Sequence, residues 1–290
     1  MRPCQLYANA FISVRSYKQM FTQARIRAMI NAETIQDAAK VLLECGYSPQ
    51  LISTSPEKDD EIVATERAAT VEKFTELCSD ANLLYCVIAK FNYHNAGLRY
   101  KNSLGLSELD ETLYPFADYV EEFSTDALSL PKPLKEAFMQ LKNISDVTAT
   151  QIDSIITHAL YTDIASHVKK IKNKAIRNYF AYEVDFLNIR AVIKGMDANL
   201  LPGGKLNKQQ VTAKAAEIKD LNEFEDESWA ELSKLSAIDN NDIFKLNLLF
   251  YWFMRKQEEL RVVKTILMGK KFGFTNDQIR ESLGGLYGRF

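Results

Sequence analysis

The sequence predicts an all-α fold, and three observations support this prediction. Only 11 of its 290 residues are glycine and 7 are proline, so the residues that break helices are scarce. Apolar side chains recur at helical spacing along most of the chain, and no stretch shows the alternation that is typical of a strand. Capping signals for helix starts occur from one end of the chain to the other. A chain of this length can form one large domain or two or three fused sub-domains.

The first third of the chain predicts two helices, a loop and a long helical stretch. Helical spacing covers residues 7–30, and a second helix follows and ends at a Cys-Gly-Tyr turn at residues 45–47. Residues 48–60 contain two prolines, three serines and a cluster of charges, which indicates a surface loop. Helical periodicity resumes over residues 61–102. From residue 134 to residue 195 we expect three more helical stretches.

Pairs of capping residues predict where several helices begin. In such a pair, a Ser, Thr or Asn side chain bonds the backbone three residues later, and the side chain at that later position bonds back. The predicted pairs are Thr34/Asp37, Ser107/Asp110, Thr150/Asp153, Asn207/Gln210 and Thr275/Gln278.

Two proline-containing segments predict boundaries between sub-domains. Pro131 and Pro133 stand one residue apart, and two prolines so close are not expected inside a helix. Residues 201–204 read Leu-Pro-Gly-Gly, in which Pro202 and Gly203 suit the second and third positions of a type II turn, with Gly204 after them. We therefore predict sub-domains over residues 1–130, 131–204 and 205–290.

A pattern recurs three times along the chain. An apolar helical stretch ends in an arginine that we expect to be buried, and a loop and a newly capped helix follow. The three arginines are Arg99, Arg190 and Arg261. Repeats of this kind build scaffolds and collars more often than active sites.

The second copy of the pattern, around residues 179–194, is the most specific segment. Asp185 and Asn188 share one helix face, and Glu183 and Arg190 share another. A buried arginine needs partners, so we interpret this helix as a donor of hydrogen bonds to neighbouring helix ends or carboxylates. An anion site is the functional alternative, although no glycine-rich phosphate cradle accompanies it. Aligning the copies on their arginines places His94 and Gly97, and likewise Lys256 and Glu259, at the positions of Asp185 and Asn188.

Two charged stretches have both a structural and a functional interpretation. A basic run comprises Lys169, Lys170, Lys172, Lys174 and Arg177. An acidic stretch covers residues 217–231. Each is interpreted either as a solvated surface or as a contact to a partner of opposite charge.

Composition and motifs argue against several classes of function. The net charge of −2 lacks the basic excess of nucleic-acid binders. The four cysteines form no CxxC pair and the three histidines lack metal-site spacing, so we expect free thiols in a reducing cytosol and no metal. Without nucleotide-binding or nucleophile motifs, we expect no cofactor and no catalytic residue. No secretory signal or bilayer-spanning run is visible, and we expect a soluble protein.

Several motifs together resemble one family. Residues 183–190 (EVDFLNIR), followed by 201–204 (LPGG), resemble a helix and turn of the C-type subunit in the central stalk of V/A-type ATPases, whose eukaryotic counterpart is the d-type subunit. Residues 24–29 (ARIRAM) with 42–47 (LLECGY) look like the opening of that family. The segments 256–261 (KQEELR), 269–273 (GKKFG) and 278–280 (QIR) look like its closing motif.

The resemblance implies an all-helical funnel of three similar bundles about a pseudo-threefold axis. In this family the funnel is a rotor socket between the central axle subunits, of D and F type, and the membrane proteolipid ring. It transmits torque for proton or sodium transport or for ATP synthesis, and it carries no catalytic site. One copy would be present per complex, at the cytoplasmic face of the membrane.

Two alternatives remain at the level of sequence. The first is a cytosolic helical-repeat scaffold that binds protein partners in a concave groove. The second is an enzyme with an all-α site that uses Glu183, Asp185 and Arg190.

Overall fold

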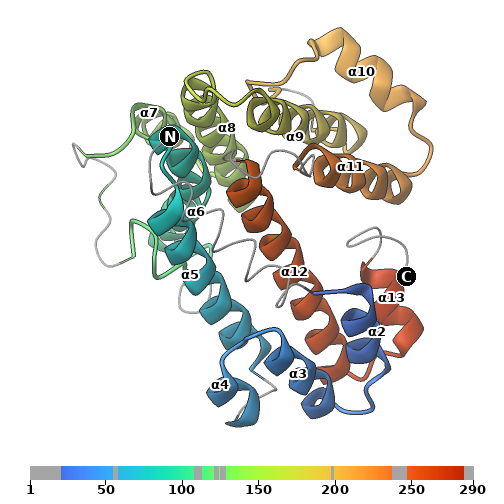
Figure 1. Cartoon of the computed structure of the whole chain (residues 1–290). Coiled ribbons are helices and arrows are strands. Elements are labelled where there is room, and N and C mark those ends of the chain that lie inside the picture. The colour runs from blue at the N-terminus through green and yellow to red at the C-terminus, as the bar shows by residue number, and fades with distance from the viewer. Residues whose placement is uncertain are drawn as a thin grey trace. The chain divides into compact units, whose positions relative to one another are not determined.

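The computed structural model describes residues 21–54, 58–107, 113–120, 124, 129–196, 199–236 and 247–283, and every regular element within these ranges is an α-helix (Figure 1). The predicted all-α class is therefore confirmed for the described part of the chain. The chain divides into two compact units, Met1–Ser79 with Asp220–Phe290 (unit 1) and Asp80–Lys219 (unit 2). Two expectations stay predictions: the threefold arrangement of bundles, and the sub-domains over residues 1–130, 131–204 and 205–290. The turn at residues 201–204 lies within unit 2.

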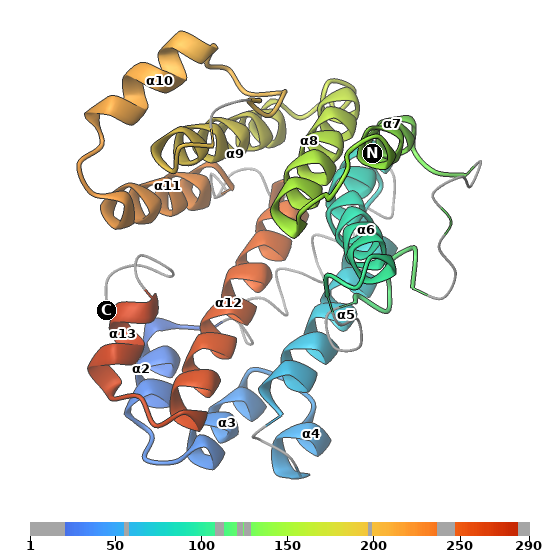
Figure 2. The same cartoon turned by 180° about the vertical axis from the view of Figure 1, so that it is seen from behind.

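Unit 1 is built around one long helix, α12. This helix packs against α2, α3, α5, α11 and α13, and α2 and α13 also contact each other at one of its ends (Figure 2). The helices of unit 1 are α2 (Gln23–Asn31), α3 (Ile35–Glu44), α4 (Pro49–Thr54), α5 (Asp59–Leu77), α11 (Leu221–Ser236), α12 (Asn247–Lys271) and α13 (Asn276–Leu283). The core contains fully buried Ile26, Met29, Leu42, Leu260 and Ile266, so segments from both ends of the sequence share it.

Unit 2 is a stack in which α8 packs between α6 and α7, and α9 packs against α8 and α10. Its helices are α6 (Ala81–Ser103), α7 (Lys132–Lys142), α8 (Ala149–Val168), α9 (Lys174–Ile193) and α10 (Lys208–Glu217). Leu83, Leu134, Phe138, Ile152 and Ile176 are buried in its core. Burial of such side chains stabilises the unit by about 1.5–3 kcal/mol each.

Two of the predicted capping pairs are confirmed in full and a third in part. The Asn207/Gln210 and Thr275/Gln278 pairs bond reciprocally. Thr34 accepts the backbone N–H of Asp37, but the Asp37 carboxylate accepts the Thr34 hydroxyl rather than its backbone N–H. Asp110 lies outside the described residues, so the pair with Ser107 stays a prediction.

The predicted pair Thr150/Asp153 is wrong by two residues. The helix begins at Ala149, and the reciprocal bonds join Thr148 and Gln151. Both registers carry a threonine followed three residues later by a polar side chain. The extended backbone at Thr148 decides between them, because only a non-helical residue can cap.

The structure also corrects the predicted elements of the first third. The helix predicted over residues 7–30 begins at Gln23, because Thr22 is extended and accepts the Arg25 N–H; residues 7–20 lie outside the described part. The predicted loop at 48–60 contains α4 and the start of α5. The helical stretch 61–102 is interrupted after Leu77, where Asp80 caps a new helix.

Pro131 and Pro133 mark the start of a helix rather than exclude one. Pro131 is the N-cap of α7, and Pro133 is in the first turn. The N–H groups of the first turn have no partner within a helix, so a proline there removes no hydrogen bond. Among the described residues, no helix combines the length and the apolar character that crossing a membrane requires.

Two glycines inside helices provide a matched test of this packing. A Cβ on Gly269 of α12 would lie 2.6 Å from Ile279 Cγ1 of α13, whereas one on Gly97 of α6 would lie 3.6 Å from Ile156 Cγ2 of α8. We expect Gly269→Ala to lower the free energy of unfolding by about 1–3 kcal/mol through overpacking. Gly97→Ala should leave it unchanged or raise it by up to about 1 kcal/mol, because alanine favours the helix. Urea unfolding measures both, and equal effects would contradict this account.

Candidate functional site

Helix α9 holds the loop that follows it through one buried amide. Asn188 is 3% exposed, and its Nδ2 donates to the backbone oxygen of Leu201 at 3.0 Å. The backbone N–H of Leu201 donates back to Asn188 Oδ1 at 2.7 Å. One side chain thus satisfies the donor and the acceptor of a residue thirteen positions away, which fixes the distance between helix and loop.

Asp185, one turn earlier on the same face, bonds the far side of the same loop. Its two carboxylate oxygens accept the backbone N–H groups of Lys205 and Leu206 at 3.2 and 3.0 Å. The predicted turn between these contacts is confirmed, because Gly203 has a positive φ of 107° after Pro202. A Cβ on Gly204 would overlap Asp185 Oδ1, so the loop reaches the carboxylate only with glycine there.

Helix α6 repeats this arrangement with a different pair of residues. Asn95 is fully buried; its Nδ2 donates to the backbone oxygen of Tyr114 at 3.0 Å, and the Tyr114 N–H donates to its Oδ1 at 2.9 Å. Asn92, one turn earlier, bonds Asp118 in the same way that Asp185 bonds its loop, by accepting a backbone N–H. Asn92 and Asn95 therefore correspond to Asp185 and Asn188.

The alignment that placed His94 and Gly97 at these positions is wrong by two residues. It took the arginines as the fixed point, but Arg99 stands four residues after its asparagine and Arg190 only two. The signal that finds the correct register is the polar pair with a spacing of three inside an apolar helix.

Helix α12 places a carboxylate at the matching position. Glu259 is fully buried, and it accepts the Phe21 backbone N–H at 3.3 Å and the Tyr47 hydroxyl at 2.8 Å. Lys256, one turn earlier, donates to Glu259 at 2.8 Å and to Glu66 at 3.0 Å. Burial alone would lower the pKa of Lys256, but the two carboxylates outweigh it and raise the pKa. The lysine is therefore charged and compensates the buried acid.

The three predicted arginines do not share one environment. Arg99 and Arg190 are half-buried, and Arg99 Nε donates to the backbone oxygen of Tyr119 at 3.3 Å. Arg261 is exposed, so the prediction of a buried arginine is wrong there; its guanidinium lies 4.4 Å from the ring centroid of Trp229. The cation–π contact lets the charge remain in water while the side chain covers an apolar ring.

Glu183 and Asp185 are turned toward different partners. Glu183 binds Lys90 of α6 through both oxygens, at 2.6 and 2.8 Å. Asp185 bonds the loop after α9. The two carboxylates considered for an enzyme are therefore each occupied by a structural contact, and they do not converge on a shared substrate position.

A second polar cluster of unit 2 has no counterpart in the sequence predictions. Asp163 of α8 is buried and accepts the hydroxyls of Tyr85 and Tyr93 at 2.5 and 2.8 Å. The His167 ring stacks on Tyr85 with centroids 3.9 Å apart, and its Nδ1 lies 3.2 Å from Asn82 Oδ1. Burial lowers the pKa of His167; Asp163 raises it in part, and Lys170 lowers it further.

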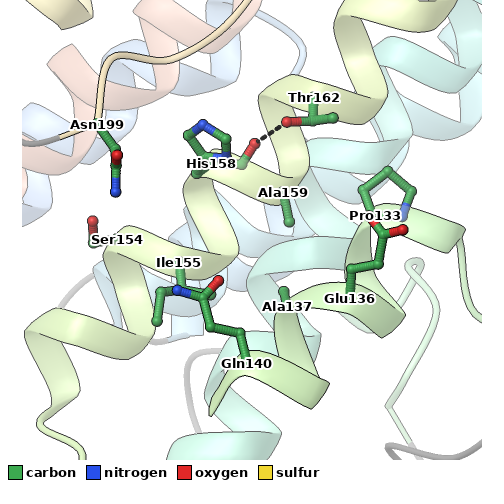
Figure 3. Close-up of a pocket in the computed structure, with 10 residues that line it drawn as sticks. All are labelled: Pro133, Glu136, Ala137, Gln140, Ser154, Ile155, His158, Ala159, Thr162 and Asn199. Carbon is green, nitrogen blue, oxygen red and sulfur yellow. Dashed lines mark hydrogen bonds between the residues drawn. The ribbon is translucent and has the colours of Figure 1, made fainter. Parts of the chain in front are cut away.

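One surface hollow of unit 2, about 320 Å³ in volume, lies between α7 and α8 (Figure 3). Its wall comprises Pro133, Glu136, Ala137, Gln140, Ser154, Ile155, His158, Ala159, Thr162 and Asn199. The Thr162 hydroxyl donates to the backbone oxygen of His158, one turn earlier in the same helix, so this hydroxyl is engaged within α8. In the described ranges, no group of three His, Cys, Asp or Glu side chains is placed to hold a metal ion.

Comparison with known proteins gives one family. The family model described as "ATP synthase (C/AC39) subunit" matches residues 8–282, which is nearly the whole chain. No curated protein matches the chain.

The buried amides can be tested by truncation. We expect Asn95→Ala and Asn188→Ala each to lower the free energy of unfolding by about 1–3 kcal/mol, because each leaves a backbone N–H and C=O without a partner. Asn102→Ala, at an exposed position of α6, should change it by less than about 0.5 kcal/mol. Denaturant titrations followed by circular dichroism measure all three, and a neutral effect of both buried truncations would contradict the assigned role.

His167 predicts a pH dependence of stability. A histidine whose pKa is lower in the folded state takes up protons more readily when unfolded, so stability rises with pH between the lowered pKa and about 6.5. As the pH falls from about 7 to about 5, wild type should therefore lose stability that His167→Phe retains. The phenylalanine preserves a ring against Tyr85. His158→Gln, at an exposed histidine, should follow wild type, and parallel profiles for all three proteins would refute the prediction.

Proposed function

Because this chain belongs to the ATP synthase (C/AC39) subunit family, and is thus a subunit of a V/A-type rotary ATPase, we propose that it is the rotor socket that joins the central axle to the membrane proteolipid ring. In this role it transmits torque and performs no chemistry itself. The match over residues 8–282 is the observation that carries the proposal.

The hydrogen bonds of the long helices support a mechanical role. A part that transmits torque must resist bending, and loops are the softest segments of a helical protein. Here α6 and α9 each hold a loop through a buried amide with bonds in both directions. Helix α12, with 25 residues, extends for roughly 37 Å and supports unit 1 along this length.

The charges inside both units support a non-catalytic role. Catalytic groups need a substrate position at which their charge or proton is used. In unit 1, Lys256 compensates Glu66 and Glu259, and in unit 2 Lys90 compensates Glu183. These contacts hold helices together and leave the ionised groups engaged with each other.

The partners in this proposal are the D- and F-type axle subunits on one side and the proteolipid ring on the other. The protein would be present in one copy per complex, at the cytoplasmic face, and would associate with the membrane through the ring.

Purification of the tagged full-length chain from mildly solubilised native membranes tests the proposal. We expect axle and proteolipid subunits of the rotary ATPase to be recovered with it in stoichiometric amounts, as measured by quantitative mass spectrometry. An unrelated protein with the same tag is the control for background. Recovery of the catalytic subunits without the axle and the ring would contradict the socket role.

A further inference from the structure

We propose that four lysines at the connection between α8 and α9 form a docking surface for a carboxylate-rich face of another protein subunit. The surface, here called the basic knuckle, consists of Lys169, Lys170, Lys172 and Lys174 (Figure 1 shows the connection). The inference rests on the proposed function, because it takes the partner to be another subunit of the rotary ATPase.

The basic knuckle is held in a defined shape. Ile171, at its centre, is fully buried. Arg177 turns back from α9 and donates through Nη1 to the backbone oxygens of Ile171 and Lys172, at 2.5 and 2.9 Å. Asn173 caps α9 by accepting the N–H groups of the next helical turn. These contacts fix the backbone that carries the lysines, so the points from which their side chains project are set.

The four charges are unpaired within the described part of the chain. All four lysines are exposed, and their side chains make neither an ion pair nor a hydrogen bond with any residue that the structure describes. Some exposed lysines elsewhere are paired, as Lys40 is with Asp37 and Lys132 with Glu136, whereas others, such as Lys205 and Lys208, are unpaired within the described ranges but stand apart from one another. In a chain with a net charge of −2, four such positive charges within six residues form a strong local field.

Two of these charges oppose the stability of the fold, whereas Lys169 and Lys170 follow the C-terminal end of α8, where the helix dipole favours a positive charge. Lys174 is the first residue of α9, and Lys172 precedes its N-cap, so both stand at the positive end of the helix dipole. Like charges this close also repel one another. An acidic partner relieves both effects, which makes the arrangement favourable in the complex and unfavourable in the free chain.

A folded protein surface fits these features better than an anionic membrane. Membrane-surface segments combine basic residues with exposed apolar side chains, and the large apolar side chains exposed in the described part of the chain lie outside the knuckle. The chain as a whole is slightly acidic, so it has no general attraction to anionic lipid. Side chains that project from one fixed and compact connection suit a partner surface on which carboxylates are likewise gathered in one place.

Carbodiimide cross-linking of the purified complex tests the partner directly, because this reagent joins a lysine amine to a carboxylate only where the two are in contact. We expect mass spectrometry to find residues 169–174 joined to Asp or Glu of another subunit. If other lysines of this chain form such links to its partners and the knuckle forms none, the inference is wrong.

A pair of matched variants tests the energetic role. One replaces the four knuckle lysines by glutamine; the other replaces Lys205, Lys208, Lys214 and Lys219, which lie on the same unit but are spread over fifteen residues. Each full-length protein is titrated against the axle-containing part and the ring-containing part of the rotary ATPase, each purified from cells that lack this subunit, between about 50 and 400 mM salt. We expect the knuckle variant to bind about tenfold more weakly at low salt and with a smaller salt dependence, and the control variant to bind like wild type.

The outcomes separate the two proposals. If wild type itself does not bind the complex, the proposed function fails and this inference fails with it. If wild type binds and the knuckle variant matches it in affinity and salt dependence, only this inference is overturned. A third outcome assigns the lysines to the membrane and also overturns this inference. In that outcome wild type binds vesicles with about 30% anionic lipid, and the knuckle variant loses this binding while its binding to the complex is unchanged.

Discussion

Three long helices each carry a hydrogen-bonding side chain that is almost completely buried, and each of these groups has its partners elsewhere in the chain. Asn95, Asn188 and Glu259 are 0–3% exposed. An unsatisfied group at such a depth costs about 1–3 kcal/mol, so the segment that satisfies it is held firmly. The loops after α6 and α9 and the segment before α2 therefore take their positions from these helices.

The three helices meet this constraint with two kinds of chemistry. An amide carries both a donor and an acceptor, so Asn95 and Asn188 each match one backbone residue without any charge. A carboxylate only accepts, and it must be compensated when it is buried. Glu259 accordingly needs Lys256 and the Tyr47 hydroxyl, and it joins three segments where the amides join two.

The sequence predicted the helical class, several caps and the turn at Gly203, because these depend on neighbouring residues. The features that the sequence analysis missed depend on residues far away in the sequence or on the backbone conformation. Spacing alone cannot distinguish Thr148 from Thr150 as a cap, since the choice rests on the backbone angles. Alignment on the arginines hid Asn95, whose role is visible only when the loop at Tyr114 folds back onto α6. The Asp163 cluster likewise assembles side chains from two helices.

Because unit 1 combines the two ends of the chain, synthesis on the ribosome imposes an order on folding. The hydrogen bonds of Tyr47 and Phe21 to Glu259 form only after Glu259 has been synthesised, 212 and 238 residues later. The helices described for unit 2 leave the ribosome before α12 exists, so this unit can close while α2, α3 and α5 still expose the apolar faces that α12 will cover. The nascent chain is therefore most vulnerable to aggregation and proteolysis at α2, α3 and α5, and the emergence of α12 from the ribosome ends that interval.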